Sequence, residues 1–376
     1  MAWLHSVRHV LVHQPVMLAA WGLVIVTACL VPPDMGLVQA IDWRVIGLLY
    51  CLMVVVMAFR RLGGIDLLSA KLIGSLRTLR RLSVGLVVMA FFASMFLTND
   101  VALISIVPLT MVILSRTGRL HAAARLVTLE AIAANLGSMA TPLGNPQNLF
   151  LYTRYQMTAE AFFSTMIPLS ALSFVLLVIV SSFAPCDEIH RDEVSQSPAE
   201  VRATPLRLGA SAVCFVLAIL AVFRIVPVFW IVFIITVGYI LFDYRSILKI
   251  DYGLLATFVA FFIFVAMLQR MEAVQMILGG AVAEHTLAGS FVLSQVISNV
   301  PAAILVSGFT KDVHALLAGV NIGGLGTLVA SLASLIAFQG YIKSCHDHKF
   351  HFICVFTTYN IVFALILLLY WNLFAG

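Results

Sequence analysis

The sequence predicts an all-α polytopic membrane protein with an inverted repeat, two re-entrant helical hairpins and two broken helices. Hydrophobic residues make up 62% of its 376 residues and charged residues only 10%, whereas soluble domains are about 45–50% apolar and about 25% charged. Several apolar runs reach the roughly 20 residues that a helix needs to cross a bilayer. Polar motifs recur in the same order in both halves of the chain. This composition excludes a soluble enzyme or a nucleic-acid-binding domain.

Uninterrupted apolar stretches predict seven membrane-spanning helices. They are 15–32, 43–59, 158–184, 207–225, 226–242, 253–270 and 352–374. Two further stretches, 122–155 and 312–340, are interrupted by glycine and asparagine and predict broken helices, which brings the crossings to nine. No small-residue cleavage site follows the first apolar run, so we expect this run to be a retained span and not a signal peptide. Segment 60–81 alternates Arg and Lys with Leu and Ile, which predicts an amphipathic helix on the membrane surface.

Two apolar segments, 82–115 and 286–310, are split near their middles by polar clusters. In the first, sixteen apolar residues precede Thr98-Asn99-Asp100 and fifteen follow. Neither arm is expected to cross the bilayer alone at about 1.5 Å per residue. The second is split at 298–301, where a proline favours the start of a new helix. We therefore expect both segments to enter the membrane and return to the same side.

The distribution of Lys and Arg agrees with this topology. With the N-terminus in the cytoplasm, 17 of the 22 basic residues fall on the cytoplasmic side, as the positive-inside rule requires. The five on the other side are Arg44, Arg154, Arg224, Arg270 and Lys311. An odd number of crossings in either split segment would move the following basic loops outside. The six cysteines form no CxxC pair, so neither a disulfide framework nor a zinc site is indicated.

The polar motifs form an internal repeat. Residues 97–101 match 297–301, and residues 134–141 match 320–327, at offsets of 200 and 186. We therefore divide the chain into a first repeat (1–184), a cytoplasmic linker with a linking span (185–225) and a second repeat (226–376). Four crossings and the linking span turn the second copy upside down. Inverted repeats whose broken helices meet near the midplane are typical of secondary transporters.

The first tip offers groups that suit a bound solute. A helix that begins near Val101 would direct its positive end into the membrane interior, and irregular backbone at that depth must line a cavity or be buried in protein. Asp100 or Asn99 could instead simply cap this helix. Ionisable residues inside membranes are usually functional, so we expect Asp100 to take part in a site. The predicted solute-binding residues are Thr98, Asn99, Asp100, Ser298, Asn299 and Pro301.

The broken helices offer groups that suit a cation. An unbroken helix over 121–155 would be about 52 Å long, too long for one crossing. The run 137–148 contains two prolines, which cannot donate backbone hydrogen bonds. A plain kink is the alternative, although a buried carboxamide left unpaired costs free energy. The predicted cation-coupling residues are Asp100, Glu130, Asn135, Gly137, Thr141, Asn145, Asn148, Asn321, Gly323 and Thr327. Na⁺ is expected at Asn99, Thr141, Asn145, Asn299 and Asn321.

Glu130 allows two interpretations. Burial in the middle of a helix favours a neutral carboxyl group and suits a proton carrier. The side chain could equally pair with Arg125 or another cation, and the sequence leaves both open. The chain contains no HExxH, GxSxG or P-loop motif, so we expect no enzyme and no cofactor other than Na⁺ or H⁺ as the coupling ion.

The stretches 96–103 and 141–148, with 298–301 and 321–324, resemble the ion-transporter superfamily. The chain is most similar to bacterial inner-membrane permeases of the arsenite/citrate permease group. This resemblance implies hairpins entering from opposite sides, solute between their tips, cation sites beside each tip, elevator-like movement and homodimers. In the dicarboxylate branch both tips read Ser-Asn-Thr. Asp100 stands where that pattern has threonine, which is closer to arsenite permeases.

Together these features predict a secondary active transporter of a small anionic solute, an oxyanion or a carboxylate, coupled to Na⁺ or H⁺. Arsenite efflux and sodium/proton antiport are the alternatives within the superfamily. A channel or a non-transporting receptor is the alternative from another class. We expect a multi-pass protein of the bacterial inner membrane with a cytoplasmic N-terminus. Its expected partners are the lipid bilayer and a second copy of the chain, without nucleic acid.

Overall fold

The computed structural model describes residues 15–62, 78–187, 205–345 and 348–374, in which every regular element is a helix. They are α2 (Pro15–Ala28), α3 (Gly36–Gln39), α4 (Trp43–Arg61), α6 (Leu79–Leu97), α7 (Asn99–Arg116), η1 (Leu120–Ala122), α8 (Ala123–Ser138), α9 (Pro146–Arg154), α10 (Ala159–Ser182), α12 (Pro205–Val222), α13 (Val228–Leu248), α14 (Tyr252–Leu268), α15 (Glu272–Glu284), α16 (Thr286–Ile297), α17 (Asn299–Ser307), α18 (Val313–Ile322), α19 (Leu332–Ile342) and α20 (Lys349–Phe374). Six of these helices are long and apolar enough to cross a membrane. The all-α polytopic fold is confirmed.

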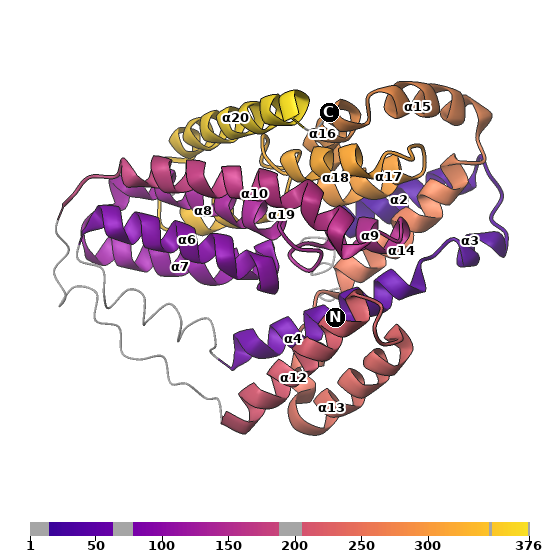
Figure 1. Ribbon diagram of the computed structural model, residues 1–376, viewed down its shortest axis with the longest axis horizontal. Helices are drawn as coiled ribbons and strands as arrows, with labels where there is room; N and C mark the ends of the chain where they lie inside the picture. Colours follow the sequence, from indigo (N-terminus) through magenta and orange to yellow (C-terminus); the bar gives the residue numbers. More distant parts are fainter. Residues whose placement is uncertain (1–14, 63–77, 188–204, 346–347, 375–376) are drawn as a thin grey trace, which may run out of the picture.

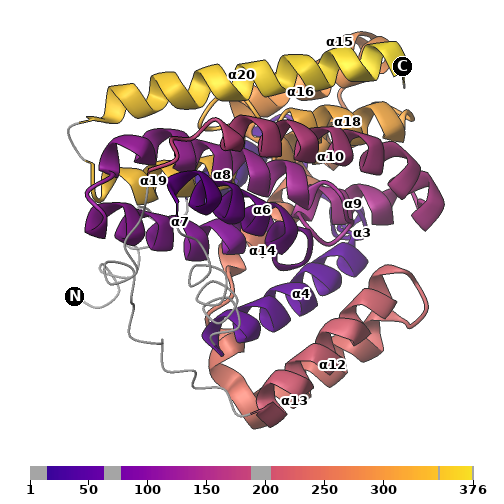
Figure 2. The same cartoon turned by 60° about the vertical axis from the view of Figure 1, so that its left-hand side comes forward.

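The helices form a larger and a smaller group (Figure 1). The larger group contains α6 to α10 and α16 to α20, with α8 packed against α6, α7, α10, α19 and α20. In the smaller group α4 packs against both α12 and α13, and Figure 2 shows these three helices set apart from the larger group. Helix α14 packs against α2 and contacts both α4 and α17. The groups therefore meet along α4, α9, α14 and α17.

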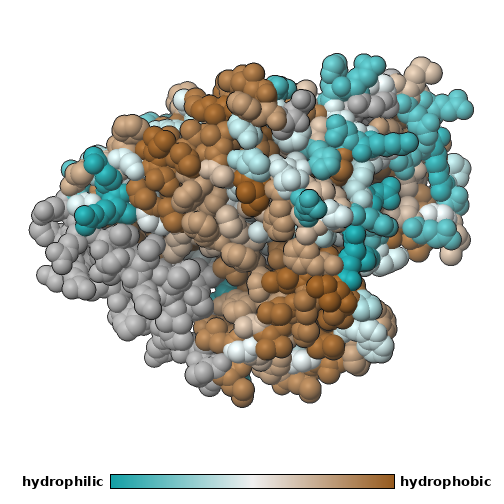
Figure 3. All heavy atoms as spheres, viewed as in Figure 1, coloured by the Kyte–Doolittle hydropathy of each residue, from teal (hydrophilic) through white to brown (hydrophobic). Residues whose placement is uncertain are grey.

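Apolar side chains cover much of the surface, as expected for helices that face lipid. The surface over α12 and α13, in the lower part of Figure 3, is largely hydrophobic. Helix α13 alone exposes Phe229, Trp230, Phe233, Ile240 and Leu241. A soluble protein rarely exposes apolar patches of this extent, so these positions fit a lipid-facing belt.

Side-chain caps explain where many of these helices begin. In each case a side-chain oxygen accepts a hydrogen bond from a backbone N–H in the first turn, which would otherwise have no partner. The capping residues are Asp42, Thr78, Asn145, Thr158, Asp251, Asp312 and Ser331. Two of these caps, Asn145 and Ser331, restart a helix after an interruption and so define the ends of the two breaks.

The predicted spans, hairpins and breaks each correspond to observed helices. The seven uninterrupted stretches coincide with α2, α4, α10, α12, α13, α14 and α20 within six residues. Of these, α4, α10, α13 and α20 are among the six helices long and apolar enough to cross a membrane. The first broken helix is α8 and α9 around residues 139–145, and the second is α18 and α19 around residues 323–331. The second break forms without a proline. The split segments are the helix pairs α6–α7 and α16–α17.

The predicted arm lengths of the first hairpin are wrong. Helices α6 and α7 contain 19 and 18 residues, and each is long and apolar enough to span a bilayer. Thr78 caps α6 by accepting a hydrogen bond from the N–H of Arg81 at 3.3 Å. The helix therefore starts at Leu79 and includes Arg80 and Arg81. Helix α7 also starts two residues earlier than expected, at Asn99. The arms of the second hairpin are shorter, at 12 and 9 residues.

The predicted surface helix, the predicted linker and the N-terminal residues lie wholly or partly outside the described residues. Of the surface helix predicted over 60–81, residues 63–77 are not described, and its ends belong to α4 and α6. Of the linker at 185–206, residues 188–204 are not described, and neither are residues 1–14 before the first span. Helix α15, between α14 and the second hairpin, was not predicted as a separate helix.

Candidate functional site

Each hairpin turns through a single residue in a strained conformation. Helix α6 packs against α7, and α16 against α17. Thr98 (φ 69°, ψ 149°) joins the first pair, and Ser298 (φ 74°, ψ 155°) joins the second. These angles suit glycine and cost other residues on the order of 1–3 kcal/mol. Because backbone strain of this kind collects at functional sites, both tips are candidates for binding.

The first tip is hydrogen-bonded to the first break. The backbone N–H of Asn99 donates to the carbonyl oxygen of Gly144 at 3.2 Å. Thr141 Oγ1 donates to the carbonyl oxygen of Met95, in the last turn of α6, at 2.5 Å. The end of α6, the start of α7 and the break are therefore held together as one unit, here called the first tip-and-break unit.

The second tip is bonded to the second break in the same way. The backbone N–H of Asn299 donates to the carbonyl oxygen of Ala330 at 3.0 Å, and Thr327 Oγ1 donates to that of Gln295 at 3.0 Å. These four residues lie 200 or 186 positions after their counterparts, the same offsets at which the sequence motifs recur. Two copies of one structural unit would form such matched bonds.

Five buried asparagine side chains lie where the two breaks meet. We call Asn99, Asn135, Asn145, Asn148 and Asn321 the central amide cluster. Asn99 Nδ2 donates to Asn135 Oδ1 at 3.0 Å within the first half. Between the halves, Asn145 Nδ2 donates to Asn321 Oδ1 at 3.1 Å, and Asn321 Nδ2 donates to Asn148 Oδ1 at 2.6 Å.

Asn135 adds two further bonds between the halves. Its Nδ2 group donates to the carbonyl oxygen of Gly324 at 3.3 Å, and its Oδ1 accepts from Ser331 Oγ at 2.9 Å. Asn299 lies at the edge of the cluster, because a Cβ atom added at Gly324 would be 3.0 Å from its Nδ2 group. The structure therefore gathers side chains that the sequence predicted separately for each half.

Several of the oxygens expected to face Na⁺ already accept hydrogen bonds. Asn145 Oδ1 accepts from the backbone N–H of Asn148 at 2.9 Å, and Thr141 Oγ1 accepts from that of Gly144 at 3.0 Å. Asn148 Nδ2 donates to the carbonyl oxygens of Met139 and Thr141, both at 3.2 Å. Each carbonyl or amide oxygen has two lone pairs, so a cation at these oxygens would share them with the existing hydrogen bonds.

The two glycines predicted near the cation sites allow close helix packing. A Cβ atom at Gly137 would lie 2.1 Å from the carbonyl oxygen of Phe91. A Cβ atom at Gly323 would lie 2.7 Å from the Cβ atom of Ser294. Any larger residue would push the break away from the hairpin arm, so these positions help to set the distance between the two.

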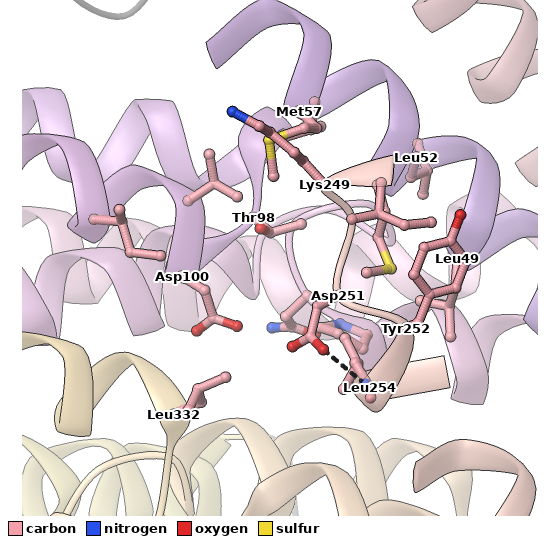
Figure 4. Close-up of a pocket in the computed structure, with 18 of the residues that line it drawn as sticks. Leu49, Leu52, Met57, Thr98, Asp100, Lys249, Asp251, Tyr252, Leu254 and Leu332 are labelled. Atoms are coloured by element: carbon pink, nitrogen blue, oxygen red, sulfur yellow. Dashed lines mark hydrogen bonds between the residues drawn. The ribbon is translucent and has the colours of Figure 1, made fainter. Parts of the chain in front are cut away.

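A cavity of about 710 Å³ lies beside the first tip. It is bordered by α4, α7, α9, α19 and the connection between α13 and α14, so it lies between the two helix groups. Figure 4 shows the carboxylates of Asp100 and Asp251 directed into this space from different sides, near Thr98. Arg60 and Lys249 also contribute to the lining. The remaining lining is largely apolar.

Asp100 does not act as a helix cap. The capping position of α7 is Thr98, whose side chain makes no capping bond, and Asn99 and Asp100 are the first two helical residues. Asn99 Oδ1 accepts a hydrogen bond from the backbone N–H of Asp100 at 3.0 Å, so Asn99 satisfies one N–H group of the first turn, whereas Asp100 does not cap the helix. Among the described residues, the buried Oδ1 atom of Asp100 has no hydrogen-bond partner. A carboxylate oxygen in this position is available to a proton, a cation or a solute.

The residues of the second tip lie away from this cavity. Ser298 Oγ donates to the carbonyl oxygen of Ala330 at 3.3 Å, and Pro301 is buried as the third residue of α17. Of the described residues that line the cavity, those from the second half belong to α19 and to the segment around Asp251. The structure therefore joins the two breaks, but it brings only the first tip to this cavity.

Glu130 is buried in α8, where its Oε1 atom accepts a hydrogen bond from Thr110 Oγ1 at 2.5 Å. Its Oε2 atom has no hydrogen-bond partner among the described residues. Arg125 instead donates to carbonyl oxygens of Val180 and Phe183. The predicted alternative of a Glu130–Arg125 ion pair is therefore wrong.

Two residues of the site were not predicted. Asp251 caps α14 by accepting from the N–H of Leu254 at 3.1 Å, and its place just before an apolar run was a usable signal. Gln295 holds the second break, donating to the carbonyl oxygens of Gly323 and Leu325, both at 2.9 Å. A glutamine inside an apolar hairpin arm was the signal for this second residue.

Comparison with known proteins assigns this architecture to a family. The citrate transporter family profile matches residues 9–318. Inner membrane protein YbiR of Escherichia coli is 35% identical over 305 residues, which cover 80% of each chain. This chain belongs to the citrate transporter family. An uncharacterized transporter of Methanocaldococcus jannaschii is 30% identical over 306 residues, covering 81% of this chain and 83% of that protein.

A more distant relative matches a shorter part of the chain. An uncharacterized transporter of Mycobacterium tuberculosis is 28% identical over 144 residues, covering 37% of this chain and 32% of that protein. The family and the long apolar helices identify the chain as a multi-pass membrane transporter.

Proposed function

We propose that this protein is a secondary active transporter that carries a small anionic solute, an oxyanion or a carboxylate, together with Na⁺ or H⁺. One observation carries the proposal. Two strained hairpin tips are bonded to two helix breaks, which join through the central amide cluster beside a cavity faced by Asp100. Unwound helices that meet in the interior are where transporters of this type bind solute and ions.

The solute would bind at the first tip. Helix α7 begins at Asn99, so its positive dipole end favours a negative charge. Thr98 lines the cavity and offers a hydroxyl group. Elevator-type movement of both hairpin tips and their breaks against α4 and α14 would bring Ser298 and Asn299 to the solute. The cavity lies between these moving parts and α4, so such a movement would change what lines it.

The coupling ion would act at Asp100. A carboxylate beside an anion is unfavourable unless a proton or a cation neutralises it. Asp100 Oδ1 has no hydrogen-bond partner in the described part of the chain. Binding of H⁺ or Na⁺ there would therefore favour binding of the anion, which is the thermodynamic basis of coupled transport.

Sodium/proton antiport is the second candidate, and a specific observation favours it. Asp100 and Asp251 both face the cavity (Figure 4), which Arg60 and Lys249 also line. A carboxylate can take up either a proton or a cation, which is the exchange that antiport requires. Under this alternative no organic or oxyanion solute is carried. Arsenite efflux is the third candidate within the superfamily, and the Asn99-Asp100 tip supports it.

We place the protein in the inner membrane with a cytoplasmic N-terminus. The Escherichia coli relative is named an inner membrane protein, which supports this location, and the distribution of Lys and Arg supports the orientation. We further expect a homodimer, which the mass of the purified protein measured by light scattering would test.

Counterflow in proteoliposomes tests the proposal. Vesicles loaded with an unlabelled solute should accumulate the labelled solute, whereas a channel or receptor would not. A thermal-shift screen against oxyanions and carboxylates, with and without Na⁺, selects the solute. Proton movement driven by Na⁺ in the absence of any solute would instead support antiport.

Three variants test the assigned residues. Asp100→Asn should retain solute exchange and lose its dependence on Na⁺ or pH, with the exposed Asp34→Asn as the control. Asn99→Ala and Asn299→Ala should each weaken solute binding. Unchanged coupling in Asp100→Asn would remove this residue from the mechanism, and wild-type affinity in both asparagine variants would contradict a site formed by the two tips.

A further inference from the structure

A second hollow lies along α6, apart from the cavity beside the first tip. It is an apolar groove of about 840 Å³ that runs from Arg80 and Arg81 to Leu97, and Ser182 of α10 also lines it. Phe92 and Phe96 line it and leave 47% and 49% of their surfaces exposed. The groove is thus an open surface on the first hairpin, and nothing in the proposed transport cycle uses it.

The groove follows one side of α6 and is long enough for a lipid acyl chain. Val84, Val88, Phe92 and Phe96 line it at four-residue intervals, which places them in one stripe along the helix. Leu97 lies sixteen positions after Arg81, which corresponds to a rise of about 24 Å along the helix. One leaflet of the hydrocarbon core is about 15 Å thick, so an acyl chain fits within this length.

The groove has a cationic end. Arg80 Nε donates to the carbonyl oxygen of Ala184, at the end of α10, at 3.0 Å, which holds this guanidinium group at the end of the groove. Arg81 is exposed one residue later. The ion pairs formed among the described residues involve neither arginine. Two adjacent guanidinium groups suit a phosphate group, which they can bind with paired N–H donors.

We propose that this groove binds an anionic phospholipid, with its phosphate at Arg80 and Arg81 and one acyl chain along the stripe from Val84 to Phe96. The arrangement matches the two parts of such a lipid, because a cationic end is followed by an open apolar groove. The inference does not depend on the transported solute. Since α6 ends at the first tip, the lipid would lie against the hairpin that carries Thr98.

Lipid retention in native mass spectrometry tests the proposal. The full chain is purified from vesicles of phosphatidylglycerol and phosphatidylcholine, and its bound lipids are counted across a range of phosphatidylglycerol concentrations. Each basic residue near an anionic lipid contributes about 1 kcal/mol, so removing two should weaken phosphatidylglycerol binding about 30-fold. The double variant Arg80→Gln/Arg81→Gln should therefore lose this lipid. The double variant Arg207→Gln/Lys343→Gln removes two exposed charges elsewhere and should retain it.

A second variant fills the groove and leaves both arginines in place. Val88→Trp should also lose the lipid while retaining the wild-type elution volume in size-exclusion chromatography. Equal retention of phosphatidylglycerol by the wild type and both groove variants would overturn the proposal, as would equal binding of phosphatidylcholine and phosphatidylglycerol. If Val88→Trp instead disrupts a dimer and leaves lipid binding unchanged, the groove is a protein contact and the proposal is wrong.

Discussion

Asn321→Ala should destabilise the protein by breaking hydrogen bonds that join the two halves in the central amide cluster. Asn321 is 3% exposed, donates to Asn148 Oδ1 at 2.6 Å and to the carbonyl oxygen of Leu317 at 2.7 Å, and accepts from Asn145 at 3.1 Å. Truncation leaves Asn148 Oδ1 buried without this partner, which costs about 1–3 kcal/mol, and the lost Asn145 bond adds about 1 kcal/mol. We therefore expect a loss of about 2–4 kcal/mol in the free energy of unfolding.

Unfolding by SDS in mixed micelles, followed by tryptophan fluorescence or circular dichroism, measures this loss. Asn360→Ala is the matched control, because Asn360 is also fully buried but donates only one local bond, to the carbonyl oxygen of Phe356 at 2.8 Å. Its loss leaves no partner side chain unpaired, so we expect a cost of about 1 kcal/mol or less. An equal or smaller effect of Asn321→Ala would show that the bonds between the two halves contribute no special stability, and would refute this reasoning.

Three further predictions follow from local geometry. Gly137→Ala should abolish monodisperse folded protein, because its Cβ atom would lie 2.1 Å from a backbone carbonyl oxygen, whereas Gly209→Ala, with nothing within 4 Å, should retain wild-type yield. Glu130→Gln should unfold within about 1 kcal/mol of the wild type, while Glu130→Ala should lose about 1–3 kcal/mol by leaving a buried threonine hydroxyl without its partner; equal losses would contradict this. The Arg270 guanidinium group holds the pKa of Asp34 below its ordinary value of 3.8, so the pair stabilises the protein at neutral pH and loses this contribution as the pH falls below about 3.8. The small difference in thermal midpoint between the wild type and Asp34→Asn should therefore disappear at low pH. A difference that does not change with pH would exclude this ion pair as its cause.

The sequence predicted the spans and breaks because membrane helices are specified by local composition. A run of apolar residues is sufficient to place a span, and polar residues inside such a run indicate a hairpin tip or a break. Thr98, Asn145 and Asn321 were identified in this way, and the structure places each at a tip or in the central amide cluster. The recurrence of motifs at two offsets also anticipated the matched hydrogen bonds.

Features that depend on contacts between distant segments could not be predicted. Asp251 faces Asp100 only because the connection between α13 and α14 packs beside the first tip. Thr110 is the partner of Glu130 because α7 and α8 pack together. In each case the deciding interaction joins residues that the sequence pattern alone does not bring together.

The accessibility of the first tip tests the central claim most directly. Thr98→Cys and Phe96→Cys, in a chain whose native cysteines are replaced by serine, are reconstituted in one orientation and treated with a membrane-impermeant thiol reagent. If the tip faces a cavity inside the protein, Thr98→Cys reacts from one face at a time, with a rate that Na⁺ or pH changes, while Phe96→Cys stays unreactive in the lipid. Thr98→Cys that reacts from neither face, or from both faces under all conditions, would contradict the account.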